Sequence, residues 1–574
     1  MKRQHLVWVA FLVLLGSVLY WNSLRTPFLC DEEDLIIGDP RVHHWSRLPD
    51  VFLKPFWKPF WGGVSIFERY YRPLITLSFR IDHMFWQFNP VGYHLTNLFF
   101  HLLNTLLVYA LLMRFFRQQS LSFIGAFLFL AHPAHVEAVT YIPGRVDLIS
   151  LVFVLSSFHL YLTGRDAEKK IWPYVLSCVS YGLALLSKEM AAFFPLILLG
   201  HALWVEPRKT KWRGAEGLLF IGMLFLFVGW FFFRRYVSVQ IPLKALLDLP
   251  RLPLRLFVIP EILFAYTKIW FFPWPLYVER AIPIEVLSVK TLILEWSLLL
   301  FSLSCLLLFF RKRLERFWLL WIAVTLLPVL QIIPIYMLGG RYLFIAEHFL
   351  YFSSVGIIGF LSSRFGHFFV SSKENPLPYP KGTFLLGAIL VCFSFLVIWR
   401  NGDYRDRITF FEQAVRHAPW SARFHNQLGL AYLAAGDPKT AEEKFLKAIS
   451  LDPMDHMPYI NVGFLYKRQG EMEKARKYFQ KAFELMPEDP IVLYNLGNME
   501  AADGRWEKAL PFYEKALKAN PDYMCAYSEK AHAYWELGEK EKALEAARQG
   551  LARDPESPIV QNIKRWIEER LRKE

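Results

Sequence analysis

Cysteine is scarce in this sequence, and the cysteines that occur do not form a recognisable site. Five are spread over 574 residues, and three of them, Cys178, Cys305 and Cys392, fall within apolar runs. No Cys-x-x-Cys pair occurs. This pattern excludes a disulfide-stapled fold and a zinc ribbon.

Charged residues are also too few, and apolar residues too many, for a soluble protein. The charged fraction is 20%, the hydrophobic fraction 54% and the aromatic fraction 17%, and the mean hydropathy is +0.26. These values indicate a polytopic membrane protein with a soluble part. The net charge of +14 does not indicate nucleic-acid binding. The basic residues lie in short clusters between apolar runs, as cytoplasmic loops do, so nucleic acid is not an expected partner.

The first apolar run, which follows Met1 to Gln4, lacks a small-residue cleavage site, so we interpret it as an uncleaved membrane helix. A helix needs ~20 residues to cross a membrane, and the number of apolar runs near this length predicts about 11 membrane spans in residues 1–400. The expected spans are 5–24, 93–113, 118–136, 148–163, 171–187, 190–205, 217–233, 296–310, 317–340, 342–363 and 382–399.

The basic clusters between these runs set the expected orientation. Placing all of them in the cytoplasm leaves the following segments outside: 25–92, 131–147, 188–189, 234–290 and 335–341. This arrangement requires that residues 254–276 do not cross the membrane. They carry Arg255, Glu261 and Lys268 together with three prolines, so we expect amphipathic helices on the outer surface.

After Arg400 the composition changes to Glu-, Lys- and Ala-rich helix, and the chain repeats itself. Prolines recur every 34 residues, and alanines recur with the same step: Pro453, Pro487, Pro521 and Pro555, and Ala441, Ala475, Ala509 and Ala543. This period is the signature of tetratricopeptide repeats. The sequence therefore predicts a capping half-repeat at 403–421, four repeats at 422–557 and a closing helix at 558–574. The expected fold class is all-α, a membrane helix bundle followed by an α-solenoid.

The most charged stretch follows the first apolar run. It has five carboxylates in the nine positions from 31 to 39. A solvated loop at a membrane exit explains Glu33 and Asp34. It explains Asp31 less well, because Asp31 follows Phe28-Leu29-Cys30 at the edge of the hydrocarbon, where loss of hydration makes a carboxylate more basic. The residues alone leave open whether Asp31 is a proton acceptor or part of a solvated loop.

Other polar residues mark the outer ends of the predicted spans. Ionisable groups close to hydrocarbon are costly, so each is a candidate functional residue. Each also has a structural alternative, such as an interfacial arginine, a polar turn, a capping ion pair at Lys188-Glu189, or pairing of Arg145 with Asp147. Glu347 lies inside an apolar run and needs a partner, for which Arg341 and His348 are the candidates. The full set is Arg72, His94, His132, His135, Glu137, Arg145, Asp147, Lys188, Glu189, Arg341 and Glu347.

Two features suggest ligands of other kinds. His132, His135 and Glu137 lie within six residues, but Pro133 breaks the helical presentation of a metal site, and a hydrogen-bonded acceptor pocket is favoured over a metal. In the repeats, Asn461 and Asn495 occupy equivalent positions. They are candidates for hydrogen bonds to an extended acceptor peptide, the alternative being amides that hold neighbouring helices together.

These residues resemble a known family, the transmembrane and tetratricopeptide repeat-containing O-mannosyltransferases and their bacterial relatives in the GT-C superfamily. The resemblance covers nearly the whole chain in the same order. It is carried by Phe28…Asp31-Glu32…Asp39-Pro40, Tyr71-Arg72-Pro73-Leu74, Pro90-Val91-Gly92-Tyr93-His94, His132-Pro133…His135…Glu137, Gly144-Arg145…Asp147, Lys188-Glu189 and Glu347…Tyr351. The chain departs from the family pattern at Glu32, Asp39 and His348-Phe349.

The resemblance implies an inverting glycosyltransferase that uses a polyprenyl-phosphate-linked sugar, with mannose the candidate. It implies Asp31 as the base, with Glu32 and Glu137 positioning hydroxyl groups. Lys188, with Arg72 or Arg341, is expected to stabilise the departing phosphate. A divalent metal is allowed rather than required. The repeats are expected to lie on the outer side of the membrane, next to the membrane lipids, and to present an acceptor that is a protein or a glycan.

Two alternatives are a tetratricopeptide scaffold for envelope proteins with a non-catalytic core, and a lipid transporter. The sequence shows no inverted internal symmetry, which argues against a transporter. It also contains no Asn-x-Ser/Thr sequon. This absence favours a bacterial inner membrane, with the repeats on the periplasmic side, over the endoplasmic reticulum.

Overall fold

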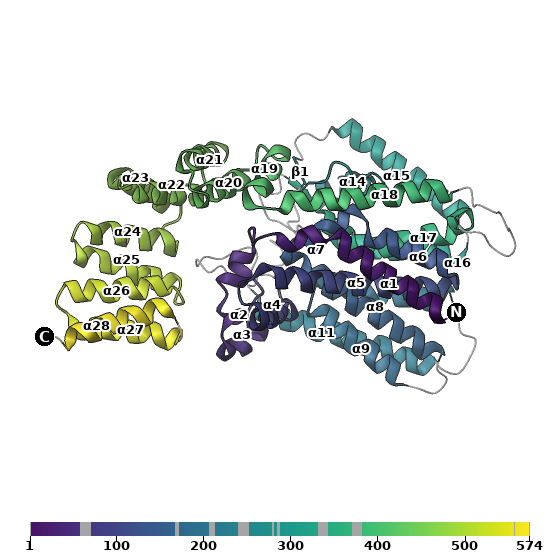
Figure 1. The fold of residues 1–574 in the computed structure, drawn as a ribbon, viewed down its shortest axis with the longest axis horizontal. Coiled ribbons are helices and arrows are strands. Elements are labelled where there is room, and N and C mark those ends of the chain that lie inside the picture. The colour runs from purple at the N-terminus through teal and green to yellow at the C-terminus, as the bar shows by residue number, and fades with distance from the viewer. Residues whose placement is uncertain are drawn as a thin grey trace.

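The computed structural model shows a helical bundle that continues into a curved solenoid (Figure 1). The residues that it describes are 2–57, 70–166, 171–205, 213–238, 252–277, 280–283, 288–310, 312–330, 342–369, 382–555 and 557–572. Apart from one two-stranded ribbon, all regular structure in these residues is helical. The predicted all-α fold class is therefore confirmed.

The bundle is built from helices that match most of the predicted apolar runs. Their bounds are α1 Lys2–Leu19, α4 Pro73–Trp86, α5 Pro90–Phe116, α6 Gln119–Leu130, α7 Val136–Thr140, α8 Arg145–Asp166, α9 Trp172–Leu185, α10 Phe194–Gly200, α11 Arg213–Val237, α13 Leu252–Phe257, α14 Ile259–Phe271, α15 Val289–Phe309, α16 Arg313–Leu326, α17 Leu350–Phe369 and α18 Thr383–Asn401.

Fewer helices are long and apolar enough to cross a membrane than the sequence predicted. Among the described residues five qualify: Pro90–Phe116, Ile142–Asp166, Gly214–Val237, Glu347–Gly366 and Phe384–Tyr404. The helices Gln119–Leu130 and Pro133–Thr140 are separated by a short break and bent by 51° relative to each other. They add a sixth span if the two are counted together as one. Three further apolar helices are shorter, so the predicted 11 spans are not confirmed.

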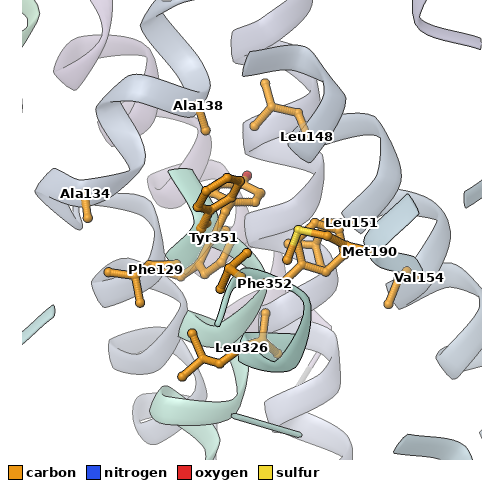
Figure 2. Packing of buried hydrophobic residues seen from close by; sticks show 14 of the residues in the cluster. Phe129, Ala134, Ala138, Leu148, Leu151, Val154, Met190, Leu326, Tyr351 and Phe352 are labelled. Atoms are coloured by element: carbon orange, nitrogen blue, oxygen red, sulfur yellow. The ribbon is translucent and has the colours of Figure 1, made fainter. Parts of the chain in front are cut away.

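The bundle core is aromatic and aliphatic, and it includes polar side chains such as Tyr351, His101 and Asn104 that hydrogen-bond one another. Figure 2 shows Tyr351 and Phe352 of α17 packed among Phe129, Leu148 and Leu151. The buried Tyr351 hydroxyl lies 2.8 Å from Nδ1 of His101 and 3.3 Å from the side-chain amide of Asn104. Hydrogen bonds of this kind offset the cost of burying a hydroxyl group.

Short elements shape the end of the bundle that carries the predicted outer segments. The acidic stretch forms η2 (Glu33–Ile37), followed by α2 (Pro40–His43), η3 (Trp45–Arg47) and α3 (Leu48–Leu53). The segment after Lys188 forms η7 (Glu189–Phe193), and η12 (Glu347–Phe349) precedes α17. β1 (Arg280–Pro283) pairs antiparallel with β2 (Tyr342–Ile345), which places Arg280 opposite Ile345, just before η12.

The solenoid begins directly after α18. Its helices are α19 Arg407–His417, α20 Ala422–Ala434, α21 Pro438–Leu451, α22 His456–Arg468, α23 Met472–Leu485, α24 Pro490–Ala502, α25 Trp506–Ala519, α26 Met524–Glu536, α27 Lys540–Arg553 and α28 Pro558–Leu571. The predicted tetratricopeptide solenoid is confirmed.

Glycine at two repeating positions explains the tight pairing of helices within a repeat. A Cβ atom on Gly429 would lie 2.5 Å from the ring of Phe445, so only glycine lets α20 approach α21 this closely. Gly436, in the turn between these helices, has φ +83°, a conformation that glycine adopts without strain. The positive φ recurs in all four repeats, and the close approach recurs at Gly463 and Gly497 but not in the fourth repeat, which has Ala531.

Candidate functional site

Asp31 lies where the acidic loop meets α7 and the solenoid. Its backbone N–H donates to the Tyr141 hydroxyl at 3.4 Å. The Asp31 side chain is 20% exposed, and its Oδ1 lies 3.9 Å from a guanidinium nitrogen of Arg423 in α20. The carboxylate is therefore accessible and bordered by polar groups, as a proton acceptor requires.

Glu32 has a different environment from its neighbour. Its side chain is buried, and Oε2 accepts hydrogen bonds from the N–H groups of Cys30 at 2.9 Å and Leu29 at 3.3 Å. Burial raises the pKa of Glu32 to about 7. The two hydrogen bonds from the backbone hold the turn that presents Asp31.

The rest of the acidic stretch is tied to neighbouring elements. Glu33 forms an ion pair of 2.5 Å with Arg407 of α19. Asp39 caps α2 by accepting from the N–H of Arg41 and forms a buried ion pair of 2.7 Å with the same arginine. The loop is thus fixed both to the solenoid and to itself.

A second polar group starts one helical turn before Tyr141, at Glu137 of α7. Nδ1 of His348 lies 2.9 Å from Oε1 of Glu137, and the backbone N–H of His348 donates to Oε2 at 3.0 Å. Glu137 and Tyr141 are four residues apart, so they lie on the same side of this helical segment. Glu137 is thereby placed between the acidic loop and η12.

Among the described residues, Glu347 has partners that the sequence did not predict. His348 binds Glu137, and Arg341 lies outside the described residues. Instead, Oε2 of Glu347 lies 3.5 Å from Arg400, which also binds Asp403 at 2.7 Å, and Oε1 accepts from the N–H of Tyr277 at 2.5 Å. Sequence reasoning missed Arg400 because it is 53 residues away and looked like the basic end of a span.

Two ion pairs, one buried and one half-buried, form a third group. Nζ of Lys188 lies 2.6 Å from Oδ1 of Asp147, and Arg72 binds Glu189 at 2.6 Å. The alternatives of a Lys188-Glu189 cap and of an Arg145-Asp147 pair are therefore wrong. Lys188 also lies 5.3 Å from the centre of the Phe349 ring, which connects this group to η12.

Arg145 is fully enclosed by partners from α4 and α5. It pairs with Asp82 at 2.5 Å and donates to Oδ1 of Asn97 at 2.7 Å and to the carbonyl of Tyr93 at 2.8 Å. Asn97 in turn donates to the carbonyl of Val139 at 3.1 Å. This network fixes the α7–α8 connection, so its geometry favours a positioning role for Arg145.

The three candidate histidines are buried and bound to main-chain carbonyls. Nε2 of His94 lies 2.9 Å from the carbonyl of Thr26, and Nε2 of His132 lies 3.0 Å from that of Trp270. Nδ1 of His135 lies 2.8 Å from the carbonyl of Phe129. In the described part of the chain, no three His, Cys, Asp or Glu side chains are grouped as metal ligands. These histidines therefore fit a hydrogen-bonded framework better than a metal site.

The two candidate amides of the solenoid have different partners. Asn461 donates to Oδ1 of Asn426 in the preceding repeat at 2.8 Å. Asn495 is buried and donates to the carbonyl of Ile491 in its own helix at 2.9 Å. Asn461 thus joins neighbouring repeats, as the structural alternative predicted.

Comparison with known proteins identifies the same two parts. Residues 74–231 match the model of dolichyl-phosphate-mannose-protein mannosyltransferases, and tetratricopeptide repeat models match 422–455, 456–520 and 500–567. The mouse protein O-mannosyl-transferase TMTC3 is 34% identical over 32% of this chain and 20% of its own length. The Caenorhabditis elegans protein O-mannosyl-transferase F38B6.6 is 25% identical over 77% of this chain and 62% of its own length.

Solved structures resemble part of this chain. The crystal structure of MamA protein is 25% identical and covers 27% of this chain and 84% of its own, with a TM-score of 0.24. The chain spans less than two thirds of the length of the curated relatives it matches. Together the family and repeat matches confirm the resemblance that the motifs predicted.

Proposed function

We propose that this chain is an integral-membrane, inverting glycosyltransferase. It moves a sugar, with mannose the candidate, from a polyprenyl-phosphate donor to a hydroxyl group of a protein at the outer face of the membrane. The observation that carries the proposal is the position of Asp31, an accessible carboxylate at the junction of the mannosyltransferase-like bundle and the first tetratricopeptide repeat. A protein held by the repeats would therefore meet the membrane-embedded donor at this carboxylate.

The reaction needs one proton acceptor and one stabilised leaving group. The acceptor oxygen forms a bond to the anomeric carbon of the sugar while the bond from that carbon to the phosphate oxygen breaks. Asp31 takes the proton of the attacking hydroxyl, and the phosphate leaves with the bonding electron pair. Attack on the face opposite the leaving group inverts the anomeric configuration.

Other residues take supporting roles in this proposal. Glu32 fixes the turn that carries Asp31, and the Tyr141 hydroxyl accepts a hydrogen bond from the Asp31 backbone N–H. Glu137, which His348 holds, accepts hydrogen bonds from hydroxyl groups of the sugar or the acceptor in this scheme. Arg72 and Lys188, each held by a carboxylate, supply positive charge for the departing phosphate. The proposed steps use the side chains of this chain and assign no step to a metal.

The direct test uses the full chain purified in detergent, a synthetic polyprenyl-phosphate mannose and a peptide with one serine. We expect mannosyl peptide whose anomeric configuration, measured by NMR, is opposite to that of the donor. A product with retained configuration would contradict the single displacement. Binding of the peptide without any transfer would support the scaffold alternative instead.

A further inference from the structure

Arg80 of α4 is a buried cation that has no acidic partner among the described residues. The residue is 1% exposed, and its Nη1 donates to the main-chain carbonyl of Arg41 at 2.7 Å. Nε and Nη2 are enclosed and have no hydrogen-bond partner in the described part of the chain. Burial lowers the pKa of this guanidinium, and no described carboxylate counteracts the shift. An unpaired buried charge is costly, so Arg80 requires a partner that the described residues do not supply.

The unused edge of Arg80 is the edge with which two neighbouring arginines bind carboxylates. Arg72 donates from Nε and Nη2 to the two carboxylate oxygens of Glu189, at 3.1 and 2.6 Å. Arg41 binds Asp39 with the same two nitrogens, at 2.9 and 2.7 Å. Their N–H groups point to one side of the guanidinium plane, which matches two oxygens of a carboxylate or a phosphate. Arg80 therefore presents a two-nitrogen edge to which an anion from outside the chain can bind.

The groups around Arg80 are basic. The rings of His43 and His83 stack with their centres 4.7 Å apart, and the ring centre of His44 lies 6.1 Å from that of His43. The pKa of His83 is lowered, first by burial and then by the positive charges of His44 and Arg80. Asp39, a carboxylate that acts on His43, is already held in an ion pair. These surroundings favour a ligand with a net negative charge.

The outer face of α4 is suited to contact with lipid. Ile81, Met84 and Phe85 follow Arg80 with helical spacing, and all three are exposed, Phe85 by 75%. The centre of the Trp45 ring lies 4.0 Å from Cζ of Arg80, and Trp45 is itself 57% exposed. Exposed apolar faces and tryptophans of this kind are typical of the membrane interface, where lipid phosphates lie. α2, α3 and α4 lie together at one end of the bundle (Figure 1).

We infer that Arg80 binds the phosphate group of an anionic membrane phospholipid through Nε and Nη2, with the acyl chains along the exposed face of α4. Trp45 moves aside to admit the headgroup. A zwitterionic headgroup is less suitable, because its ammonium group enters basic surroundings. Arg80 lies eight residues after Arg72, ~12 Å along the helix, so this site is separate from the charge that we assign to the departing phosphate. The binding does not depend on the proposed glycosyl transfer.

The test uses the full chain, delipidated in detergent, and native mass spectrometry to measure the affinity of the tightest-bound lipid. For the wild type we expect phosphatidylglycerol to bind roughly tenfold or more tightly than phosphatidylcholine, and Arg80→Met should lose this preference. Arg80→Lys keeps the charge without the two-nitrogen edge. It should lose most of the preference, and it provides the measurement if the methionine variant does not fold. The matched control is Lys54→Met, which removes a less buried cation from the same outer segment and should keep the preference.

The same lipid preference in the wild type and in both Arg80 variants would overturn the inference. Thermal unfolding gives a second readout, because a ligand that binds only the folded chain stabilises it. Phosphatidylglycerol should raise the Tm of the wild type more than that of Arg80→Met, and equal rises would contradict the site. Two further probes identify the source of the phosphate. Glycerol phosphate that binds as tightly as phosphatidylglycerol would assign the site to a soluble anion, and polyprenyl phosphate that binds more tightly would assign it to the sugar donor. Either result overturns the phospholipid.

Discussion

Nζ of Lys188 lies 2.6 Å from Oδ1 of Asp147, and the two side chains are 3% and 0% exposed. The pair joins the start of α8 to the segment that precedes η7. Removal of one partner from a buried ion pair leaves an uncompensated charge, which costs about 3–5 kcal/mol. Lys188 therefore stabilises the bundle through Asp147, and it also carries the positive charge that we propose for stabilising the departing phosphate.

Replacement of Lys188 by methionine should lower the stability of the bundle by about 3–5 kcal/mol, because Asp147 remains charged and buried. The double variant Lys188→Met/Asp147→Asn should recover most of this loss. Thermal unfolding of the detergent-purified protein measures both effects. Lys54→Met is the control, since Lys54 pairs with Asp50 at a more exposed site and should change stability by less than about 1 kcal/mol. Equal stability of the single and double variants would contradict a buried, charged Asp147.

Glu32 predicts a pH dependence of stability. Burial raises the pKa of its carboxyl group to about 7 from an ordinary value of 4.5, so between these values the folded chain binds the proton more strongly than the unfolded chain. Stability should therefore fall as the pH rises from 4.5 to 7, by about 3 kcal/mol from this group, and then level off.

The variant Glu32→Gln should lack this part of the pH dependence, because glutamine keeps the shape of the side chain and does not ionise. Midpoints of thermal unfolding at a series of pH values, for the wild type and the variant, measure the difference. Parallel curves for the two proteins across pH 4.5–7 would show that Glu32 does not titrate in this range.

The repeats and the acidic loop are expected on the outer side of the membrane. α5 has 27 residues, a length of about 40 Å, which is long enough for its two ends to lie on opposite sides of a bilayer. Its start lies in the part of the bundle that contacts the solenoid, and its end carries the basic cluster that ends at Arg117.

In a cysteine-free background, a cysteine at Lys447 should react with a membrane-impermeant maleimide in intact cells. A cysteine at Ser120, just after the basic cluster, should react only after permeabilisation. Both positions are exposed. The opposite labelling pattern would place the repeats in the cytoplasm and would contradict a site on the outer face.

The sequence predicted the elements whose signals are local. The 34-residue step of prolines and alanines defined the solenoid, because each repeat uses the same packing positions. Apolar runs located most bundle helices. Several of these helices are shorter than the runs, however, since Pro133 and the turn at Lys188 interrupt them.

The partners of the buried charges could not be predicted in the same way. Lys188 and Asp147 are 41 residues apart, and Glu347 and Arg400 are 53 apart, so only the packing of helices brings them together. Sequence neighbours such as Lys188 and Glu189 gave the wrong pairs for this reason. The contact of Arg423 with Asp31 could not be predicted either, although Arg423 is a cation at a position where the other three repeats have apolar residues.

The central claim is that Asp31 takes the proton of the acceptor hydroxyl. It is tested most directly by the rate of mannosyl transfer from polyprenyl-phosphate mannose to a serine peptide in the Asp31→Asn variant. A general base contributes roughly 10²- to 10⁴-fold, so we expect kcat to fall at least a hundredfold with unchanged thermal stability. Asp50→Asn, in the same outer segment, should keep the wild-type rate. Wild-type kcat in the Asp31→Asn protein would contradict the account.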